Sequence, residues 1–573
     1  MQKKEILSVK NLNLYFSKRQ IKYPAIQDVC FNINEGETVG LVGESGCGKS
    51  ITATAIMNML PNKASTDGEI IFTNPEGKKF IISSLDPTGK EMQSIRTGEI
   101  GMIFQEPMTS LNPVYSINRQ ISEAIRAHGK YSKKEAFNQV VDLLRYVGIS
   151  DPEKRANQYP HQFSGGMRQR AMIAMAIKGS GIWSRFSKNV KDKEAPLKMI
   201  KLLDEYHGSI TGMFTGDECL AGKDPNQGTE LCSVVEYMYS LEWLTAITGD
   251  PIYSDRLERI TFNALPATFL PDMWAHQYDQ MVNQVECSLQ KEFPFKTNSS
   301  ESHLFGLEPN FGCCTANMHQ GWPKFAASAV MGYSDGLVIN SYVPLLVNNK
   351  DFKIEISGSY PFIESAEIQV KENLEGRKRP LKLRIPGWCS KAEIKFKGKV
   401  FNCDKGGYFE MNEPWVKNDS IQIKFYSNFK LENNEKENYA LVKGPLVYSL
   451  RIKEQQKEAK EVLRRTTENI RDTNWELYPA SEWKYSFVSD SAKTIEEIHH
   501  EFGKYIFSPE NPPLELKVKV READWDFANG FIKKYNKAKP DGKVLKVVFI
   551  PYGCTNLRLT EMPIDGGIKN EQC

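Results

Sequence analysis

The hydrophobic pattern of this chain of 573 residues changes three times, and these changes constrain the fold. Residues 1–177 alternate strand-like and helix-like segments, which is typical of an α/β domain. Residues 178–196 are polar and lose this periodicity, so we interpret them as a junction. Apolar residues then recur at helical spacing over 197–333 and with period two over 334–573. The sequence therefore predicts a multidomain chain with an α/β, an all-α and an all-β part.

Composition and charge exclude several classes of protein. The 74 Lys and Arg residues nearly cancel the 71 Asp and Glu residues, which gives no support for nucleic-acid binding. The apolar runs are of strand length and no signal segment follows Met1, so we expect a cytoplasmic protein, at most peripheral on the cytoplasmic face of the cell membrane. The 11 cysteines are odd in number and five lie within 219–314, which favours metal binding or thiolate chemistry over disulfides.

A glycine-rich turn between a predicted strand and a predicted helix fits the phosphate-binding pattern G-x-x-x-x-G-K-[ST]. It consists of Gly43, Glu44, Ser45, Gly46, Cys47, Gly48, Lys49 and Ser50. The glycines allow backbone N–H groups to turn toward a phosphate, and the helix N-terminus adds positive potential. Lys49 would neutralise β/γ-phosphate charge, and the Ser50 hydroxyl would coordinate Mg²⁺. The turn predicts a P-loop NTPase; a glycine-rich turn without a ligand is the alternative.

Two further segments resemble motifs of the ABC family. Residues 101–113, with Gln105, resemble the Q-loop of peptide and nickel importers, and residues 159–170 resemble their signature. The signature residues are Ser164, Gly165, Gly166 and Met167. Residues 1–177 thus resemble the ATP-binding subunit of an oligopeptide/dipeptide (nickel) ABC importer. The resemblance implies that Gln105 senses the γ-phosphate and couples to transmembrane permease subunits, and that the signature contacts ATP on a second ATP-binding subunit. Phe16 either stacks on adenine or belongs to the core.

The resemblance to the ABC family ends soon after the signature. The family has a strand ending in Asp-Glu about 23 residues beyond the signature serine; the Asp holds Mg²⁺ and the Glu polarises the attacking water. That count reaches Ser187, inside the polar junction. Residues 202–205 look similar, but they lie about 40 residues from Ser164 and Tyr206 follows where proline is expected, so we do not assign them this role. We expect this module to hydrolyse ATP poorly.

A second set of motifs combines acidic residues with cysteines. These motifs occupy residues 216–222, 228–232, 310–323, 439–448 and 551–555. They resemble glycoside hydrolase family 127, the β-L-arabinofuranosidase-like proteins, from about Leu197 to nearly the C-terminus. The resemblance implies a carbohydrate substrate and an (α/α)₆ barrel followed by β-sandwich domains, which we expect to form two modules in residues 334–573.

Four of these residues form a plausible zinc-binding set of one oxygen and three sulfurs: Glu230, Cys232, Cys313 and Cys314. A bound metal would keep a thiol deprotonated at neutral pH. The resemblance implies that Cys313 is the zinc-bound nucleophile of a retaining hydrolase, forming a thioglycosyl intermediate, with Glu218 as acid/base. Asp217 is the alternative acid/base.

Less specific interpretations of these residues stay open. Cys313 and Cys314 could instead be buried apolar side chains, as free cysteines often are. Cys219 and Cys287 have no assigned partner and are expected in the core. Residues 276–278 either line a sugar pocket or lie on the solvated surface.

Each of the two modules lacks a part of its family's fold, and both missing parts would fall at the same place in the chain. About 135 helical residues precede the strands, too few for a complete barrel, so we expect its first half to be absent and an apolar face to be open to water. The losses of both modules fall between residues 178 and 198. The sequence therefore predicts a chimeric chain of a truncated ABC module and a partial glycosidase, by resemblance a hydrolase twice over. A fusion without catalytic activity in either half is the alternative.

Overall fold

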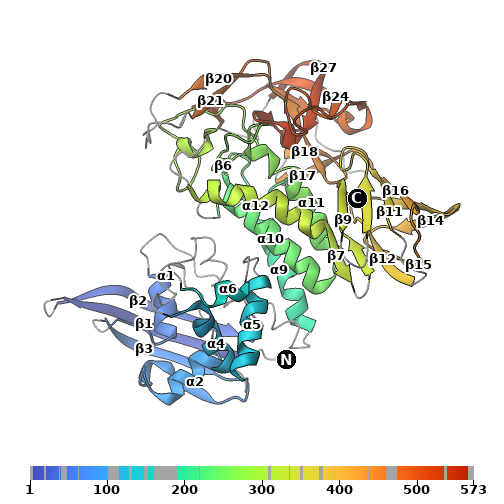
Figure 1. Cartoon of the computed structure of the whole chain (residues 1–573). Coiled ribbons are helices and arrows are strands. Elements are labelled where there is room, and N and C mark those ends of the chain that lie inside the picture. The colour runs from blue at the N-terminus through green and yellow to red at the C-terminus, as the bar shows by residue number, and fades with distance from the viewer. Residues whose placement is uncertain are drawn as a thin grey trace, which may run out of the picture. The chain divides into compact units, whose positions relative to one another are not determined.

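The chain folds into two compact units, residues 1–196 and 197–573, shown in the computed structural model of Figure 1. The structure describes residues 4–18, 21–35, 37, 39, 48–61, 64–100, 115–127, 132–146, 152–159, 190–217, 220–306, 312–333, 336–348, 353–372, 378–435, 438–459, 474–533 and 539–565.

The N-terminal unit contains an antiparallel sheet. Its strands are β1 (Glu5–Lys18), β2 (Ile21–Asn34), β3 (Ala64–Thr73) and β4 (Lys79–Ile81), in the order β2-β1-β3-β4. Leu7, Val9, Leu12 and Leu14 of β1 are buried, and a register shift between Val9 and Leu12 keeps all four in the core. Phe16 packs against this core, as one of the two interpretations of that residue expected.

Short helices accompany this sheet. They are α1 (Lys49–Ile56), α2 (Lys90–Gly98), α4 (Ile117–Ala127), α5 (Lys133–Tyr146) and α6 (Pro152–Ala156). The apolar residues Ala136, Val140, Val141 and Leu144 of α5 are buried and recur at helical spacing, as the pattern of alternating helix-like and strand-like segments in residues 1–177 predicted. Ser132 and Glu135 form a capping box there: the Ser132 N–H donates to Glu135 Oε2 at 2.8 Å, and the Glu135 N–H donates to Ser132 Oγ at 3.2 Å.

Helix α9 (Val190–His207) begins inside the segment that we interpreted as a junction without periodicity. That interpretation missed the helix because the segment's charged residues and alanine favour helix without forming an apolar stripe. Pro196 lies within the helix, at the boundary between the two units. Residues 202–205 belong to α9, so our decision not to assign them as the Asp-Glu strand of an ABC protein is confirmed.

Three helices of the C-terminal unit pack on one another: α10 (Leu231–Thr248), α11 (Pro251–Thr261) and α12 (Gly312–Ala329). The turn between α10 and α11 follows standard capping chemistry. Gly249 ends α10 with φ +68°, a left-handed conformation that glycine adopts at little cost. Asp250 then begins α11, its side chain accepting a hydrogen bond from the Ile252 N–H at 3.0 Å.

Two sheets follow in residues 330–426. The first has the order β14-β13-β16-β11-β10-β9, the second β15-β12-β8-β7. Their strands are β7 (Val330–Tyr333), β8 (Gly336–Ile339), β9 (Leu345–Asn348), β10 (Lys353–Ser357), β11 (Ser365–Val370), β12 (Lys378–Ile385), β13 (Lys391–Phe396), β14 (Lys399–Asp404), β15 (Gly407–Pro414) and β16 (Ser420–Tyr426). Alternate residues of β10 and β11 are buried and share one core with β12, so the period-two pattern is confirmed here.

A third large sheet contains most of the remaining strands, in the order β17-β18-β19-β27-β24-β22, with β23 on β24, β28 on β19 and β29 on β18. These strands are β17 (Lys430–Glu435), β18 (Asn438–Lys443), β19 (Leu446–Arg451), β22 (Tyr485–Phe487), β23 (Glu496–His499), β24 (Leu514–Asp524), β27 (Lys539–Pro551), β28 (Arg558–Leu559) and β29 (Met562–Pro563). Short pairs flank it: β5 (Thr229–Glu230) with β6 (Asp279–Gln280), β20 (Glu454–Glu458) with β21 (Trp475–Pro479), and β25 (Phe527–Ala528) with β26 (Phe531–Ile532).

A buried charge network joins α11 to β12. Arg384 is fully buried and forms ion pairs with Asp255 and Glu258. Glu258 also accepts hydrogen bonds from Tyr360 Oη at 2.7 Å and Ser341 Oγ at 2.6 Å. Burial raises the pKa of Asp255 to about 6 despite the attraction of Arg384. The helices and the first β module are thus connected by a buried Arg384–Glu258 pair and by Asp255, which is partly exposed.

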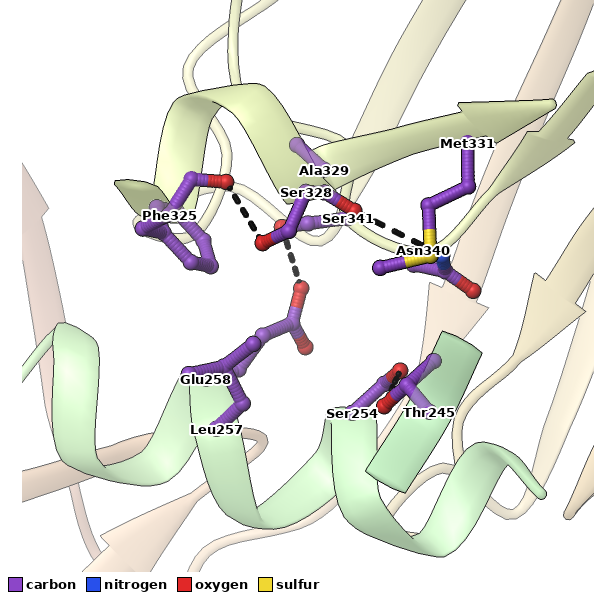
Figure 2. Close-up of a pocket in the computed structure, with 10 residues that line it drawn as sticks. All are labelled: Thr245, Ser254, Leu257, Glu258, Phe325, Ser328, Ala329, Met331, Asn340 and Ser341. Carbon is purple, nitrogen blue, oxygen red and sulfur yellow. Dashed lines mark hydrogen bonds between the residues drawn. The ribbon is translucent and has the colours of Figure 1, made fainter. Parts of the chain in front are cut away.

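A small cavity lies beside this network (Figure 2). It has a volume of about 10 Å³ and is lined by Glu258 together with Ser254, Thr245 and Ser341. Such a volume is about what one water molecule needs, so this cavity is too small for a substrate.

Candidate metal–thiolate site

Four potential metal ligands converge in the C-terminal unit. One ligand atom each from Glu230, Cys232, Cys313 and Cys314 lies within 4.8 Å of all the others. The Sγ atoms of Cys232 and Cys314 are 3.3 Å apart, too far for a disulfide bond, and these cysteines are free. The structure thus brings together all four residues that the sequence predicted as a zinc-binding set.

Two helix N-termini position the sulfurs. Cys232 is the second residue of α10, and Cys313 and Cys314 are the second and third residues of α12. Because α10 packs on α12, their first turns present the thiols to one another. Glu230 occupies the N-cap position of α10 without capping it, so its carboxylate remains beside the sulfurs. The positive ends of two helix dipoles therefore favour negative charge at this point.

The three thiols have different surroundings. Cys313 is exposed, Cys232 is half-buried and Cys314 is buried. Hydrogen bonds from Cys232 and Cys314 hold the pKa of the Cys313 thiol well below its usual range, and Tyr278 lowers it further. The pKa of Cys232 is raised by its hydrogen bond to Cys313, and the pKa of Cys314 is raised by its hydrogen bonds to Cys232 and Cys313. The exposed cysteine of the cluster is thus Cys313, which contradicts the alternative that both Cys313 and Cys314 are buried apolar side chains.

The donor set fits a zinc ion. Zinc takes sulfur at about 2.3 Å and carboxylate oxygen at about 2.0–2.2 Å in tetrahedral sites, which places ligand atoms roughly 3.3–3.8 Å from one another. The four ligand atoms all lie within 4.8 Å of one another, so their side chains would close in slightly around an ion. Asn317 Nδ2 donates to Cys232 Sγ at 3.1 Å and Ser233 Oγ donates to Glu230 Oε2 at 3.1 Å, so two of the ligands already have supporting partners.

The segment 276–278 lies in the protein interior. His276, Gln277 and Tyr278 are all buried, so the interpretation of this segment as solvated surface is wrong. His276 Nε2 lies 3.0 Å from Thr315 Oγ1, in the helical turn that carries the cysteines. Its Nδ1 lies 3.1 Å from the Gln277 carbonyl oxygen, which makes Nδ1 the protonated nitrogen and Nε2 the acceptor for the Thr315 hydroxyl. Through the contact between His276 and Thr315, the segment packs against the first turn of α12.

Asp217 is an anchor for the chain. Its Oδ2 accepts hydrogen bonds from the backbone N–H groups of Thr297 at 2.6 Å and Asn298 at 2.8 Å. Burial alone would raise the pKa of Asp217, but these hydrogen bonds outweigh it, so the net shift is downward. A carboxylate held ionised in this way is a poor general acid. Glu218, the other acid/base candidate, and Cys219 lie outside the described residues; Cys287 is buried, as expected.

Sequence reasoning missed some of the supporting residues. Asn317 lies four residues after Cys313, on the same face of α12, so helical periodicity could have found it. Asn298 could not have been found in this way: its side chain bridges the Asp217 carbonyl and Asp279 Oδ2 from a loop distant in sequence.

Most of the predicted nucleotide-binding residues lie outside the described residues. These are Gly43, Glu44, Ser45, Gly46, Cys47, Gln105, Ser164, Gly165, Gly166 and Met167. Gly48 precedes α1 with φ +97°, a conformation that glycine adopts without strain, and α1 begins at Lys49, as the predicted strand–turn–helix requires at its helical end.

Comparison with known families assigns a part of each unit. Residues 26–180 match the family model described as ABC transporter, and residues 336–426 match the one described as Beta-L-arabinofuranosidase, GH127 middle domain. The chain thus combines a segment similar to ABC transporter domains with a segment similar to the GH127 middle domain.

The ABC transporter domain has many curated relatives. The probable peptide ABC transporter ATP-binding protein y4tR of Sinorhizobium fredii (strain NBRC 101917 / NGR234) is 45% identical over 174 residues, 30% of this chain and 50% of that protein. The dipeptide transport ATP-binding protein DppD of Bacillus subtilis (strain 168) is 47% identical over 175 residues, 30% of this chain and 50% of that protein. The chain thus spans about half the length of the curated relatives it matches.

Among solved structures, a GH127 beta-L-arabinofuranosidase from Geobacillus stearothermophilus T6 aligns with 78% of this chain and 72% of its own. The identity is 16% and the TM-score is 0.49. Within the described part of the chain, we find no helix that combines the length and apolarity needed to cross a membrane.

Proposed function

We propose that residues 197–573 form a zinc–thiolate glycosidase module for L-arabinofuranosides, joined to an ATP-binding module in residues 1–177. The observation that carries the first half of this proposal is the convergence of Glu230, Cys232, Cys313 and Cys314, with Cys313 alone exposed. The match of residues 336–426 to a β-L-arabinofuranosidase domain supplies the substrate class.

The proposed chemistry is retaining hydrolysis with a thiolate in place of one carboxylate. Zinc, when bound, would keep the sulfur deprotonated. Cys313 Sγ attacks the anomeric carbon as the bond to the leaving oxygen breaks, and Glu218 gives that oxygen its proton. Water then displaces the sulfur after losing a proton to Glu218, which restores both groups. The ionised state and the two backbone hydrogen bonds of Asp217 support Glu218 over Asp217 as acid/base.

The proposed domain organisation follows the sequence motifs. Residues 1–177 are a truncated ABC module, 178–196 a junction that includes the start of α9, 197–333 a partial (α/α)₆ barrel, and 334–573 a region of two β-sandwich modules. The three packed helices α10, α11 and α12 and the separate sheets of residues 330–426 and 430–563 support this division.

A zinc assay tests the metal centre. We expect about one zinc per purified chain, and Cys232→Ser to lower metal affinity by at least tenfold because it removes one thiolate ligand. Cys403→Ser is the matched control, since Cys403 lies in β14 outside the cluster. Full zinc occupancy in a Cys232→Ser, Cys314→Ser double variant would show that the metal binds elsewhere.

The alternative function is a fusion without catalysis in either half. It also allows zinc to bind, so the discriminating experiment is cleavage of an aryl L-arabinofuranoside by the zinc-loaded chain. Robust turnover that tracks zinc occupancy favours the glycosidase, whereas zinc-loaded chains without turnover favour the fusion.

Nucleotide binding is a second candidate function, of the N-terminal unit. The family match to residues 26–180 and the left-handed Gly48 before α1 favour it. The proposed ligands are ATP and Mg²⁺, held by residues 43–50 and Gln105, with Ser164–Met167 serving a partner subunit. Because the relatives are ATP-binding proteins of peptide transport, we propose a second ATP-binding subunit and permease subunits as partners, on the cytoplasmic face of the membrane.

Lys49→Ala tests this second function. We expect the variant to bind a fluorescent ATP analogue at least tenfold more weakly, because the lysine charge on the phosphates is lost, a loss of roughly 1.5–3 kcal/mol. Lys90→Ala, an exposed lysine of α2, should bind like the parent chain. Equal affinity of the two variants for the ATP analogue would show that the predicted P-loop does not bind the nucleotide.

A further inference from the structure

A polar cleft of about 410 Å³ opens in the C-terminal unit beside α11. Its lining includes Asp204, Lys223, Arg256, Arg259, Trp388 and Glu432. It shares no residue with the cysteine cluster. The volume lies within the range of about 300–1,000 Å³ that is usual for small-molecule sites.

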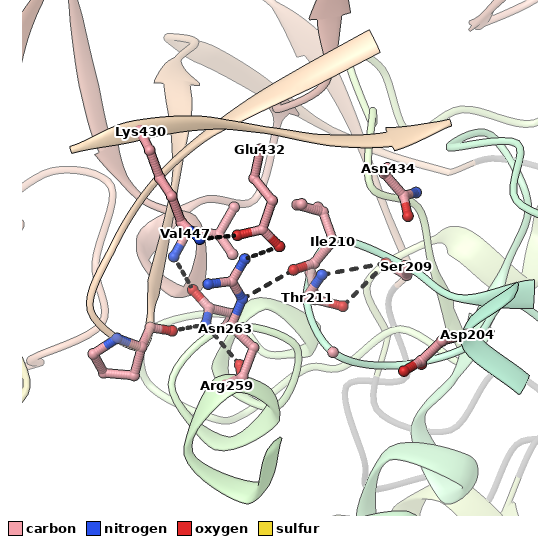
Figure 3. A network of polar contacts seen from close by, with 12 residues as sticks. Asp204, Ser209, Ile210, Thr211, Arg259, Asn263, Lys430, Glu432, Asn434 and Val447 are labelled. Atoms are coloured by element: carbon pink, nitrogen blue, oxygen red, sulfur yellow. Dashed lines mark hydrogen bonds and ion pairs between the residues drawn. The ribbon is translucent and has the colours of Figure 1, made fainter. Parts of the chain in front are cut away.

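Two arginines of the cleft are held in place without a ligand. Arg259 Nε donates to the Ile210 carbonyl at 3.0 Å and its Nη2 lies 3.5 Å from Glu432 Oε1 (Figure 3). Arg256 Nη1 donates to the Gly212 carbonyl at 2.7 Å, and its other terminal nitrogen pairs with Asp204. Since these side chains are already held in place, ligand binding would cost little additional side-chain entropy.

Gly212 makes this arrangement possible. Its φ is +86°, and a Cβ at this position would lie 3.0 Å from Arg259 Cγ and 3.3 Å from Arg256 Cδ. A side chain there would push both arginines away from the loop carbonyls that orient them. The cleft is thus shaped by a backbone conformation that favours glycine.

The charges of the cleft largely cancel. Arg256 and Arg259 pair with Asp204 and Glu432, and the other two charged side chains of the lining, Lys223 and Asp255, carry one charge of each sign. Neither a phosphate nor a metal cation would therefore find an excess of opposite charge. What the lining offers is a mixture of hydrogen-bond donors and acceptors, which suits hydroxyl groups because each of them both donates and accepts.

An aromatic ring adds an apolar wall. Trp388 is half-buried and lines the cleft next to Gly444, whose missing Cβ would lie 3.5 Å from Trp388 Cζ3. A tryptophan face offers a large rigid surface to the C–H groups of a ring, while the charged groups serve its hydroxyls. A neutral ring that carries several hydroxyl groups matches both the aromatic wall and the polar groups of this lining.

We propose that this cleft is a second, non-catalytic carbohydrate site, which binds a neutral oligosaccharide away from the cysteine cluster. It would retain the polymer from which the cysteine site removes sugars. The choice of L-arabinose as the sugar rests on the proposed function; the neutral saccharide class rests on the cleft itself.

Fluorine NMR of the full chain labelled with 5-fluorotryptophan tests this site directly. The probe is an L-arabinose oligosaccharide, added to the Cys313→Ala variant so that it is not consumed. We expect the Trp388 signal, assigned by its loss in Trp388→Phe, to shift with sugar concentration. Lys223→Met should weaken binding about tenfold through loss of a charged donor, and Lys399→Met, an exposed lysine of β14, should not.

A Trp388 signal that stays fixed at saturating sugar, or a Lys223→Met variant that binds like Lys399→Met, would overturn the second site. This outcome is separate from failure of the glycosidase. Hydrolysis without a Trp388 shift would reject only the cleft, and a Trp388 shift without hydrolysis by the parent chain would reject only the catalytic proposal.

Discussion

Cys313→Ser lowers the rate of aryl L-arabinofuranoside hydrolysis by on the order of 10⁴-fold or more, because it removes the group that attacks the anomeric carbon. Cys313 is the exposed member of the cluster, and its pKa is held well below its usual range by Cys232 and Cys314. A serine hydroxyl at this position would be protonated at neutral pH and far less nucleophilic. The measurement is kcat/KM with the zinc-loaded chain.

Zinc content separates the loss of a nucleophile from the loss of the site. Glu230, Cys232 and Cys314 remain in the variant, so we expect it to retain bound metal at saturating zinc. Cys403→Ser should retain parental activity, since Cys403 lies in β14 away from the cluster. If Cys313→Ser hydrolyses the substrate within tenfold of the parent chain, Cys313 is not the nucleophile.

Arg384→Met destabilises the C-terminal unit by about 3–5 kcal/mol, because it leaves the buried Glu258 and the partly buried Asp255 without their cation. The loss depends on pH. Burial already raises the pKa of Asp255 to about 6, and without Arg384 the pKa rises further above the unfolded value, so the folded variant takes up protons. Its stability is then greatest below the unfolded pKa near 4 and falls as pH rises through the folded pKa. Calorimetric melting at pH 5 and pH 8 measures this.

The matched control is a lysine of a surface ion pair in the same β module. Lys395 pairs with Glu393 at 3.2 Å and is 56% exposed, so Lys395→Met should change stability by less than about 0.5 kcal/mol. If Arg384→Met changes stability by no more than Lys395→Met does, or if its effect on stability is independent of pH, the buried network does not have the role proposed for it.

The elements predicted best are those whose signal is local. The stripe of Ala136, Val140 and Leu144 and the period-two segments of β10, β11 and β16 recur every few residues, and the structure forms α5 and the expected strands from them. The cysteine cluster was also predictable, because its ligands occur in short motifs at the starts of two helices. The ligands of the cluster come together once these two helices pack on each other.

Features that depend on distant residues could not be predicted in this way. In β12 the alternation Leu381, Leu383 places Arg384 on the face expected to meet solvent, yet Arg384 is fully buried. The reason is that Asp255 and Glu258, on α11 more than 120 residues earlier, cover that face and neutralise the charge. Burial of residues 276–278 and the start of α9 within the expected junction were missed for related reasons: neither has an apolar period of its own.

Zinc X-ray absorption of the purified chain tests the metal–thiolate centre. We expect one zinc site with three sulfur ligands at about 2.3 Å and one oxygen at about 2.0–2.2 Å, from Cys232, Cys313, Cys314 and Glu230. We also expect two sulfur ligands in Cys313→Ser. A spectrum with only nitrogen and oxygen ligands, or one unchanged by Cys313→Ser, would contradict the metal–thiolate centre.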